Sequence, residues 1–571
     1  MKITTAVSLE YKKLFSDFGS TSIEILLKPI PTKQALELIC HFYAQMHTKE
    51  QDFQLQKNYL VGWINKIPST EKAKIIKPIM ASINSINSTQ SAQKSPFNFF
   101  NNYSTLILIQ ELLENHNNLP ADKPLTSAEV FQLLKAYLYC SQTWIDKQPF
   151  GKTSNDQVEN LIELIFPVQF PQIELVDFKD FRLQMIKASY FFKFCEGNTL
   201  FKEYLQVFLT GRGISTWRDY LKYIADIYVG KLNKKVTPSL MSIDDTEANK
   251  ELITWLDLLC IDLKNFKSDE DFLGLREKPI YKFGKDQYLF LNFNFIIDKF
   301  YQGIKFDFAH ELIEKKSLYK TKPIKEVGQF LGIYGEHFSE SGLFYEVLNH
   351  VFANSKYSAK FSGNDLKPFF PKGGEPDYYM REKGKVYLFE YKDVTFASQH
   401  KHSFDYANIK SALFEKFVRD KKGKAEGVSQ LVNSIEKIAA GQYKQFDNYD
   451  MEKMTIYPIL VFTDMSFNTP GVNYLLNKEM CRQIEEKGLQ QIINIKKLVM
   501  IDLDHLIKFQ DHFRSKKITF NHCLNGYCAE VSKSALLSKV SSFTHWIHDK
   551  TYNMPYMKDP MLNGIIEDIT R

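Results

Sequence analysis

The stretch that decides the fold of the C-terminal part reads Gly373-Gly-Glu-Pro-Asp377-Tyr-Tyr-Met-Arg-Glu-Lys-Gly384-Lys-Val-Tyr-Leu-Phe-Glu390-Tyr-Lys392. Two β-prone segments flank Gly384, which tolerates a positive φ, so the stretch predicts a β-hairpin. Alternation along the second segment places Glu390 and Lys392 on one face of the strand. Because bulky side chains lie on both faces, we expect this strand to be central and buried.

Charges at the end of a buried strand need partners, because an unpaired buried charge is costly. Asp377, at the start of the first strand, can approach Glu390 across the hairpin. Two converging carboxylates form a hard oxygen site that suits Mg²⁺ or Mn²⁺. A lysine beside such a metal, here Lys392, can orient or activate water and stabilise charge on a phosphoryl group. The pattern therefore predicts metal-assisted phosphodiester hydrolysis.

Pro376-Asp377 followed by Glu390-Tyr-Lys392 resembles the PD-(D/E)XK pattern of the restriction-endonuclease-like nuclease superfamily. The resemblance covers residues 325–510. It implies a hairpin within a mixed sheet flanked by helices, and cleavage that leaves 5′-phosphate ends. It also implies metal ligation by Asp377 and Glu390, with the Tyr391 carbonyl as a further ligand.

The same resemblance implies two supporting residues on helices. Gly342-Leu-Phe-Tyr-Glu346 fits the upstream helix of the superfamily, which makes Glu346 the expected metal-proximal acid. Glu336 and Glu340 are rivals, because both lie nearer the apolar side of a helical wheel. Gln430 is the expected glutamine on the helix after the motif, although serine at 434 departs from the Gln-x-x-x-Tyr form of one exonuclease branch.

Several other polar clusters have weaker functional interpretations. A basic run is predicted to contact phosphates, with a solvated loop as the alternative: Lys416, Arg419, Lys421, Lys422 and Lys424. His400 and His402 fit exposed loop residues better than substrate contacts. His522 with Cys523 and Cys528 fits core or surface residues better than a metal site. Asp502 is predicted to cap a helix that follows a strand.

The rest of the chain divides into two helical regions. Residues 1–104 have helical periodicity and end in a Ser- and Asn-rich stretch at 82–95, which predicts a linker. Residues 105–320 continue the helical pattern, with a capping box at Thr126 and Glu129 and a β-hairpin near 280–291. Residues 321–571 alternate helices and strands. We therefore expect a multidomain protein, with an α-rich N-terminal half and a C-terminal α/β restriction-endonuclease-like domain that has a mixed central sheet.

Composition and charge exclude several classes of protein. The 571 residues are 44% hydrophobic and 25% charged, as in a globular protein, and contain no apolar run of membrane-spanning length. Seven dispersed cysteines favour reduced thiols, so we expect a cytoplasmic protein. The net charge of +6 is uninformative, but residues 372–424 hold twelve basic and eight acidic residues. That local surplus favours a nucleic-acid partner near the motif.

The leading hypothesis is a Mg²⁺-dependent endonuclease, with Mn²⁺ as the alternative metal, that hydrolyses DNA in bacterial restriction or antiphage defence by analogy. The N-terminal half would then recognise the substrate, a protein partner or a trigger, and a homodimer would cut both strands. Two alternatives stay open. One is a non-catalytic nucleic-acid-binding or scaffold protein that retains the nuclease fold, and the other is a nuclease that cuts RNA or DNA junctions with the same site.

Overall fold

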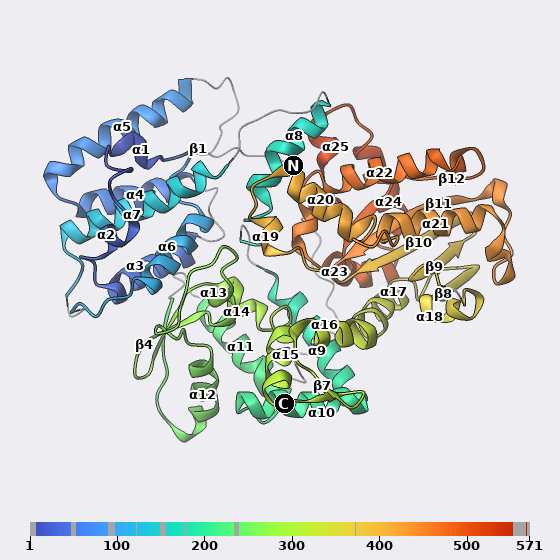
Figure 1. Ribbon diagram of the computed structural model, residues 1–571, viewed down its shortest axis with the longest axis horizontal. Coiled ribbons are helices and arrows are strands. Elements are labelled where there is room, and N and C mark those ends of the chain that lie inside the picture. The colour runs from blue at the N-terminus through green and yellow to red at the C-terminus, as the bar shows by residue number, and fades with distance from the viewer. Residues whose placement is uncertain are drawn as a thin grey trace.

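The computed structural model describes residues 7–46, 53–88, 97–120, 123–148, 156–175, 179–232, 239–371, 373–551 and 567. The N-terminal helices gather at one end of the molecule and the main sheet lies at the other, with a second group of helices joining them (Figure 1). The helical N-terminal half and the mixed C-terminal sheet are confirmed.

The N-terminal group packs around a core to which Leu275, Tyr281 and Leu289 from farther along the chain also contribute. Its helices are α1 (Tyr11–Leu14), α2 (Ile23–Leu27), α3 (Thr32–Met46), α4 (Phe53–Lys66), α5 (Ser69–Ser88), α6 (Asn102–Glu114) and α7 (Ser127–Asp146). The predicted capping box at Thr126 and Glu129 is confirmed at the start of α7. Of the predicted linker, the first part belongs to α5, and residues 89–95 lie outside the described residues.

The joining helices are α8 (Gln157–Gln169), α9 (Phe181–Gly197), α10 (Thr199–Arg212), α11 (Trp217–Leu232), α12 (Lys250–Leu258), α13 (Leu273–Glu277), α14 (Phe293–Asp298) and α15 (Ile304–Glu314). The predicted hairpin near 280–291 is confirmed: β4 (Ile280–Gly284) pairs antiparallel with β5 (Gln287–Phe290), and β3 (Leu240–Ser242) adds the third strand.

The main sheet has the order β12-β11-β10-β9-β8, and β13 also pairs with β11. Its strands are β8 (Ala359–Ser362), β9 (Tyr378–Glu382), β10 (Lys385–Lys392), β11 (Thr455–Phe462), β12 (Asn494–Ile495) and β13 (Val499–Asp502). β9 and β10 form the predicted antiparallel hairpin, while β10 runs parallel to β11. β10 is therefore central, as its two-sided apolar pattern predicts, and its middle six residues are buried.

The hairpin turn differs from expectation in one detail. Lys383, not Gly384, has the positive φ, at 54°. Glycine is needed at 384 because a Cβ there would collide with the carbonyl oxygen of Lys453 in the turn before β11. A close backbone approach, rather than a left-handed conformation, explains the residue type.

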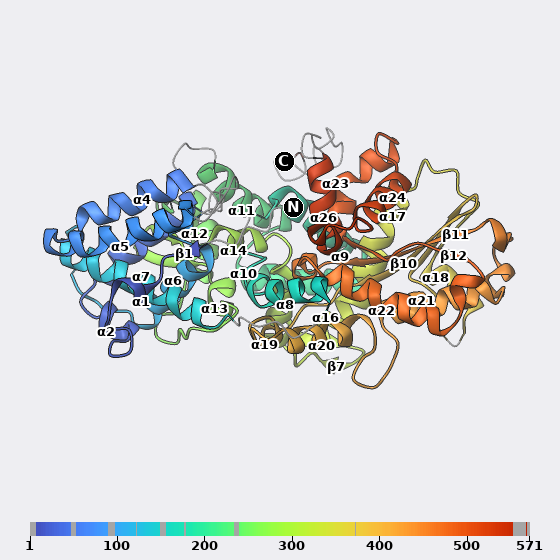
Figure 2. The same cartoon turned by 90° about the horizontal axis from the view of Figure 1, so that it is seen from above.

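Helices cover both faces of this sheet, as Figure 2 shows in the view from above. On one face lie α16 (Val327–Tyr334), α17 (Tyr345–Val351), α23 (Leu503–Arg514), α24 (Phe520–Glu530) and α26 (Phe543–Thr551), in a core shared with α9–α12, α14 and α15. On the other lie α8, α20 (Tyr406–Phe417), α21 (Gly427–Ala439), α22 (Val472–Glu486) and α25 (Leu536–Val540). Helices from the N-terminal half therefore share a hydrophobic core with the sheet on both of its faces.

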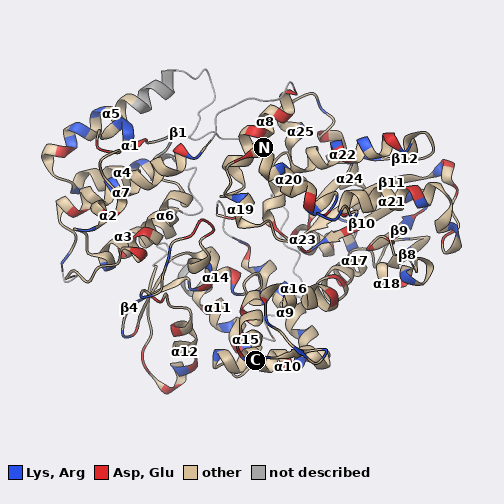
Figure 3. Ribbon diagram, in the orientation of Figure 1, with Lys and Arg blue, Asp and Glu red and all other residues tan. Residues whose placement is uncertain are grey.

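Basic and acidic residues are interspersed over the ribbon of the whole molecule, with no segregation into charged halves (Figure 3). Of the helices that the structure describes, none combines the length and apolar character that crossing a bilayer requires.

Candidate functional site

The hairpin brings Asp377, Glu390 and Lys392 to one end of the main sheet. Asp377 directly precedes β9, and Tyr378 pairs with Phe389 across the antiparallel ladder, so Asp377 lies beside Glu390. The backbone N–H of Tyr391 donates to Asp377 Oδ2 at 2.6 Å, which holds the carboxylate against the end of β10. Glu390 and Lys392 occupy the same face of β10 because they are two residues apart.

Glu390 is the most unusual residue of this group. Its side chain is 0% exposed, and neither carboxylate oxygen accepts a hydrogen bond from a donor in the described part of the chain. The polar group facing it is another carboxyl, Asp377, which can donate a proton only when it is neutral. Burial and then the charge of Asp377 raise the pKa of Glu390 well above its ordinary value. An orphaned buried carboxylate costs several kcal/mol unless a cation compensates it.

Burial and a neighbouring negative charge also raise the pKa of Asp377, but less than that of Glu390. Burial, followed by the charge of Glu340, raises the pKa of Asp377 to about 7. The Tyr391 amide and the Lys392 charge oppose this rise without cancelling it. Three carboxylates, from β9, β10 and an upstream helix, therefore repel one another at a single place.

The upstream acid in this group is Glu340, and the structure does not bring Glu346 there. Glu346 is exposed on α17, and Glu336 is exposed and accepts a hydrogen bond from Tyr319 at 3.3 Å. The physical reason is the π-helix Gly335–Phe344, whose wider turns change which residues share a face compared with a 3.6-residue wheel. Glu340 is half-buried and accepts a hydrogen bond from the hydroxyl of Tyr345.

Lys392 is held by the start of α21. Its Nζ lies 2.5 Å from Glu426 Oε2 and donates to Gln430 Oε1 at 2.7 Å. The Gln430 oxygen also accepts from the backbone N–H of Gly427 at 2.7 Å, which fixes the amide. The structure thus brings Gln430 to Lys392, as the resemblance implies, and adds Glu426, which the sequence analysis missed. Glu426 could have been found in the sequence as an acidic residue four positions before Gln430, the spacing at which side chains meet on a helix.

The Tyr391 side chain lies on the opposite face of the sheet from Glu390. Its ring stacks on Phe344 with centroids 4.5 Å apart, and its hydroxyl lies 2.8 Å from Ser339 Oγ. Ser339 in turn donates to Asp393 at 2.6 Å. These contacts tie the π-helix to the end of β10, so the helix that carries Glu340 is positioned by the strand that carries Glu390.

The predicted basic run begins with Lys416 in the last turn of α20 and continues through the turn between α20 and α21, just before Glu426. Arg419, Lys421, Lys422 and Lys424 are exposed, and Lys416 is half-buried. Asp420 accepts hydrogen bonds from the backbone N–H groups of Lys422 and Lys424, at 2.9 and 2.8 Å, which orders the turn. Apart from a long 3.6 Å pair between Lys421 and Glu415, these cations form no ion pair with the residues described.

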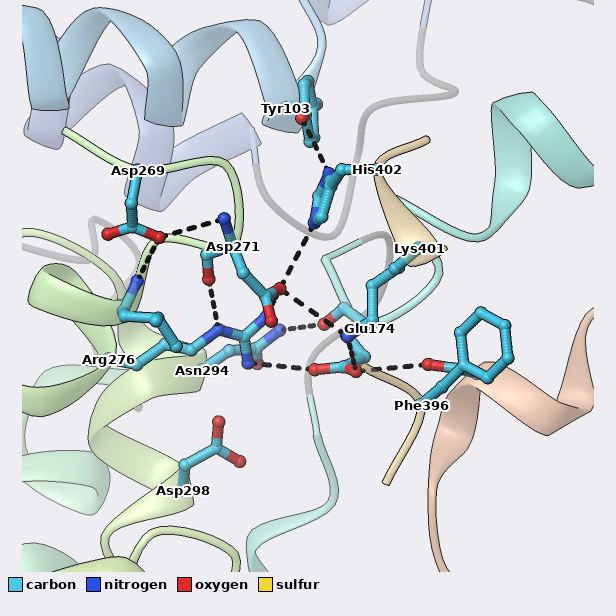
Figure 4. A network of polar contacts seen from close by, with 12 residues as sticks. Tyr103, Glu174, Asp269, Asp271, Arg276, Asn294, Asp298, Phe396, Lys401 and His402 are labelled. Carbon is cyan, nitrogen blue, oxygen red and sulfur yellow. Dashed lines mark hydrogen bonds and ion pairs between the residues drawn. The ribbon is translucent and has the colours of Figure 1, made fainter. Parts of the chain in front are cut away.

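The two histidines after the motif separate in the structure. His400 is half-buried in α19 (Ser398–Lys401), and its Nδ1 lies 2.6 Å from Asn408 Oδ1. His402 is buried, with one ring nitrogen 3.2 Å from the Tyr103 hydroxyl and the other 3.3 Å from Asp271 Oδ1. Figure 4 shows this as part of a network that joins the N-terminal helices to the sheet domain.

Glu174 is the acid at the centre of that network. It accepts from Lys401 at 3.0 Å and from Arg276 at 2.9 Å (Figure 4). Burial alone would raise its pKa, but the charges of Lys401, Arg276 and Lys179 outweigh burial, so the pKa of Glu174 lies well below its ordinary value. Every charge of this network has a partner, which identifies it as a structural junction.

Among the described residues, no group of three or more His, Cys, Asp or Glu side chains has a preformed metal-binding arrangement. This includes the His522, Cys523 and Cys528 segment, where Cys523 is buried and Cys528 is half-buried. It also includes the three carboxylates: one oxygen of Asp377 and one of Glu340 are engaged by Tyr391 and Tyr345. Glu390 keeps two unengaged oxygens at their centre.

Comparison with protein-family models, with curated proteins and with solved structures finds no match for this chain.

Proposed function

We propose that the C-terminal sheet domain is a metal-dependent nuclease that hydrolyses phosphodiester bonds, with DNA as the first substrate to test. The resemblance to PD-(D/E)XK nucleases supports the proposal through its motif residues. The element order supports it as well, because a Glu-bearing helix, the β9–β10 hairpin, a Gln-bearing helix and the parallel strand β11 follow one another. The polymer and a role in bacterial defence rest on that resemblance alone.

The observation that carries the proposal is the buried, unpartnered carboxylate of Glu390. A divalent cation would compensate its charge together with that of Asp377, and Glu340 would complete the set. Oxygen donors alone suit Mg²⁺ or Mn²⁺ rather than zinc. When bound, such a cation supplies a more acidic water and neutralises charge on a phosphate oxygen.

The protein's own residues have separate roles in this proposal. Lys392 keeps its ammonium at a fixed place, because Glu426 and Gln430 occupy two of its donors. Its third N–H is then available to orient the attacking water or to stabilise charge on the phosphate. Lys392 acts here as a hydrogen-bond donor.

The test incubates full-length protein with double-stranded DNA, single-stranded DNA and RNA, in Mg²⁺, in Mn²⁺ and with a chelator. We expect metal-dependent cleavage that Asp377→Asn and Lys392→Met reduce by about 100-fold or more, since each removes a group that acts on developing charge. Glu452→Gln, an exposed carboxylate before β11, is the matched control and should stay near the wild-type rate. Intact substrates in every arm, from protein that still binds nucleic acid, would instead support a non-catalytic binding protein.

A further inference from the structure

A groove of about 550 Å³ lies beside the candidate site, between α21 and the loop that leads into β9. Its lining includes Gly373, Gly374, Asn433, Lys437, Ala440 and Gln442. The groove is close to the motif at both walls. Gly374 precedes Asp377 by three residues, and Asn433 follows Gln430 by three residues, which is about one helical turn.

Lys437 is the cation of this groove, and its charge is not neutralised by a contact. Its Nζ donates to the carbonyl oxygens of Gly374 at 2.6 Å and Gly373 at 3.3 Å, and it lies 4.7 Å from the ring centroid of Phe370. It forms no ion pair with any residue that the structure describes. Burial lowers the pKa of Lys437, and the more distant charge of Glu375 only partly offsets that effect. An anion arriving in the groove would relieve this cost.

The one carboxylate lining the groove does not compensate Lys437. Glu436 is exposed and pairs with Lys487 on α22. Two glycines form the opposite wall of the groove. Gly373 and Gly374 have φ values of 76° and 85°, in the left-handed region that favours glycine. A Cβ at Gly374 would lie 2.6 Å from Lys437 Nζ, so a larger residue there would displace the ammonium from its present position.

We propose that Lys437, above the Gly373–Gly374 turn, binds a backbone phosphate of the nucleic-acid strand that the candidate site cuts. The inference rests on the proposed function and adds the path of the substrate. Lys437 follows Gln430 by seven residues, which is about 10 Å along α21. The contact would therefore fall on a phosphate near the scissile bond.

A lysine contact of this kind has a characteristic energetic signature. Phosphate contacts position the nucleic acid without reading its sequence, and each one makes binding more salt-dependent. Lys437 should therefore contribute to affinity equally for substrates of different sequence. It should not change the chemical step, because Lys437 contacts neither Lys392 nor the carboxylate group.

The experiment measures oligonucleotide binding by the full chain, with a chelator present, over a range of salt concentrations. Lys437→Gln should weaken binding several-fold and lower the slope of log affinity against log salt by about 0.9 for duplex or about 0.7 for single strands. Lys437→Arg, which keeps the charge, should retain the slope. Lys453→Gln removes one charge from an exposed site at the opposite end of β10 and should match wild type. In Mg²⁺, Lys437→Gln should raise KM and leave kcat nearly unchanged.

The outcomes separate the inference from the proposed function. Equal salt slopes for Lys437→Gln and Lys453→Gln would overturn the inference, even if the wild type cleaves. A Lys437-dependent slope without cleavage would uphold phosphate binding by Lys437 and overturn the nuclease. A mononucleotide or inorganic phosphate that binds wild type but not Lys437→Gln, with oligonucleotide binding unchanged, would overturn the inference in favour of a site for a small phosphate compound.

Discussion

Glu390 is a single residue whose presence at the end of β10 does not stabilise the fold. A carboxylate that is 0% exposed and lacks a hydrogen-bond donor is a net cost to folding. An apolar residue would satisfy the same strand position, since its neighbours on that face are Val386 and Leu388. Polar groups that weaken the fold without forming contacts are most simply retained for binding or catalysis.

A comparison of two glutamates tests which helix acid belongs to the site. Glu340→Gln should lower the rate of cleavage by about tenfold or more, because Glu340 is coupled to Asp377 and Glu390. Glu346→Gln, on the same helical segment but exposed, should leave the rate within about twofold. Steady-state cleavage assays of both variants decide the matter. A larger loss for Glu346→Gln would restore the assignment that the sequence motif implies.

At the scale of secondary-structure elements, the sequence predicted the features that depend on contacts between residues close together in the chain. Alternation in β10, the hairpin, the capping box of α7 and the Asp502 cap of α23 depend on neighbouring residues, and all are confirmed. The π-helix has no comparable signal, because it depends on how the segment packs against Tyr391 and Asp393. The choice between Glu340 and Glu346 therefore required the tertiary structure.

The cap of α23 predicts a pH dependence of stability. Asp502 accepts from the Asp504 N–H at 2.9 Å and from Asn468 at 2.6 Å. Burial and then the charge of Asp504 raise its pKa to about 7, so the folded chain favours the neutral form. The contribution of neutral Asp502 to the stability of the folded chain is complete below the pKa of an unfolded aspartate, near 4. That contribution is lost as the pH rises through about 7.

Asp502→Asn keeps a capping side chain and removes the titration. The variant should lack the loss that Asp502 causes between about pH 4 and pH 7, which amounts to a few kcal/mol at about 1.4 kcal/mol per pKa unit. Denaturant unfolding of both proteins at several pH values measures the difference. Parallel pH profiles for wild type and variant would show that Asp502 has an ordinary pKa.

At the scale of the whole molecule, the two halves are joined by buried polar contacts that no local pattern could reveal. Lys401 and Glu174 are 227 residues apart in the chain, and Tyr103 and His402 are 299 apart (Figure 4). Such pairs form only after the halves pack, so the sequence predicted exposed histidines where the structure buries one. Ser466, four residues after the end of β11, donates to Glu174 at 3.4 Å, so the junction also contacts the end of the main sheet.

Removal of the central acid should loosen this junction. Glu174→Gln removes the nearer of the two carboxylates that Lys401 and Arg276 share, and leaves them only the longer pairs with Asp271. Breaking a buried pair typically costs about 3 to 5 kcal/mol. We expect earlier unfolding in denaturant and a separation of the transition into two steps. Glu270→Gln is the matched control, since its pair with Lys147 is solvent-exposed and should be worth under about 1 kcal/mol. Equal effects of the two substitutions would contradict a stabilising junction.

Mn²⁺ titration tests most directly the proposed binding of a divalent metal ion by Glu390 and Asp377. Calorimetric titration and thermal unfolding report binding without any assay of cleavage. Wild type and Glu346→Gln should bind Mn²⁺, with stabilisation of about 2.7 kcal/mol at a hundred times Kd. Glu390→Gln and Asp377→Asn should lose both the binding heat and the stabilisation. Mn²⁺ binding that neither substitution changes would contradict the account.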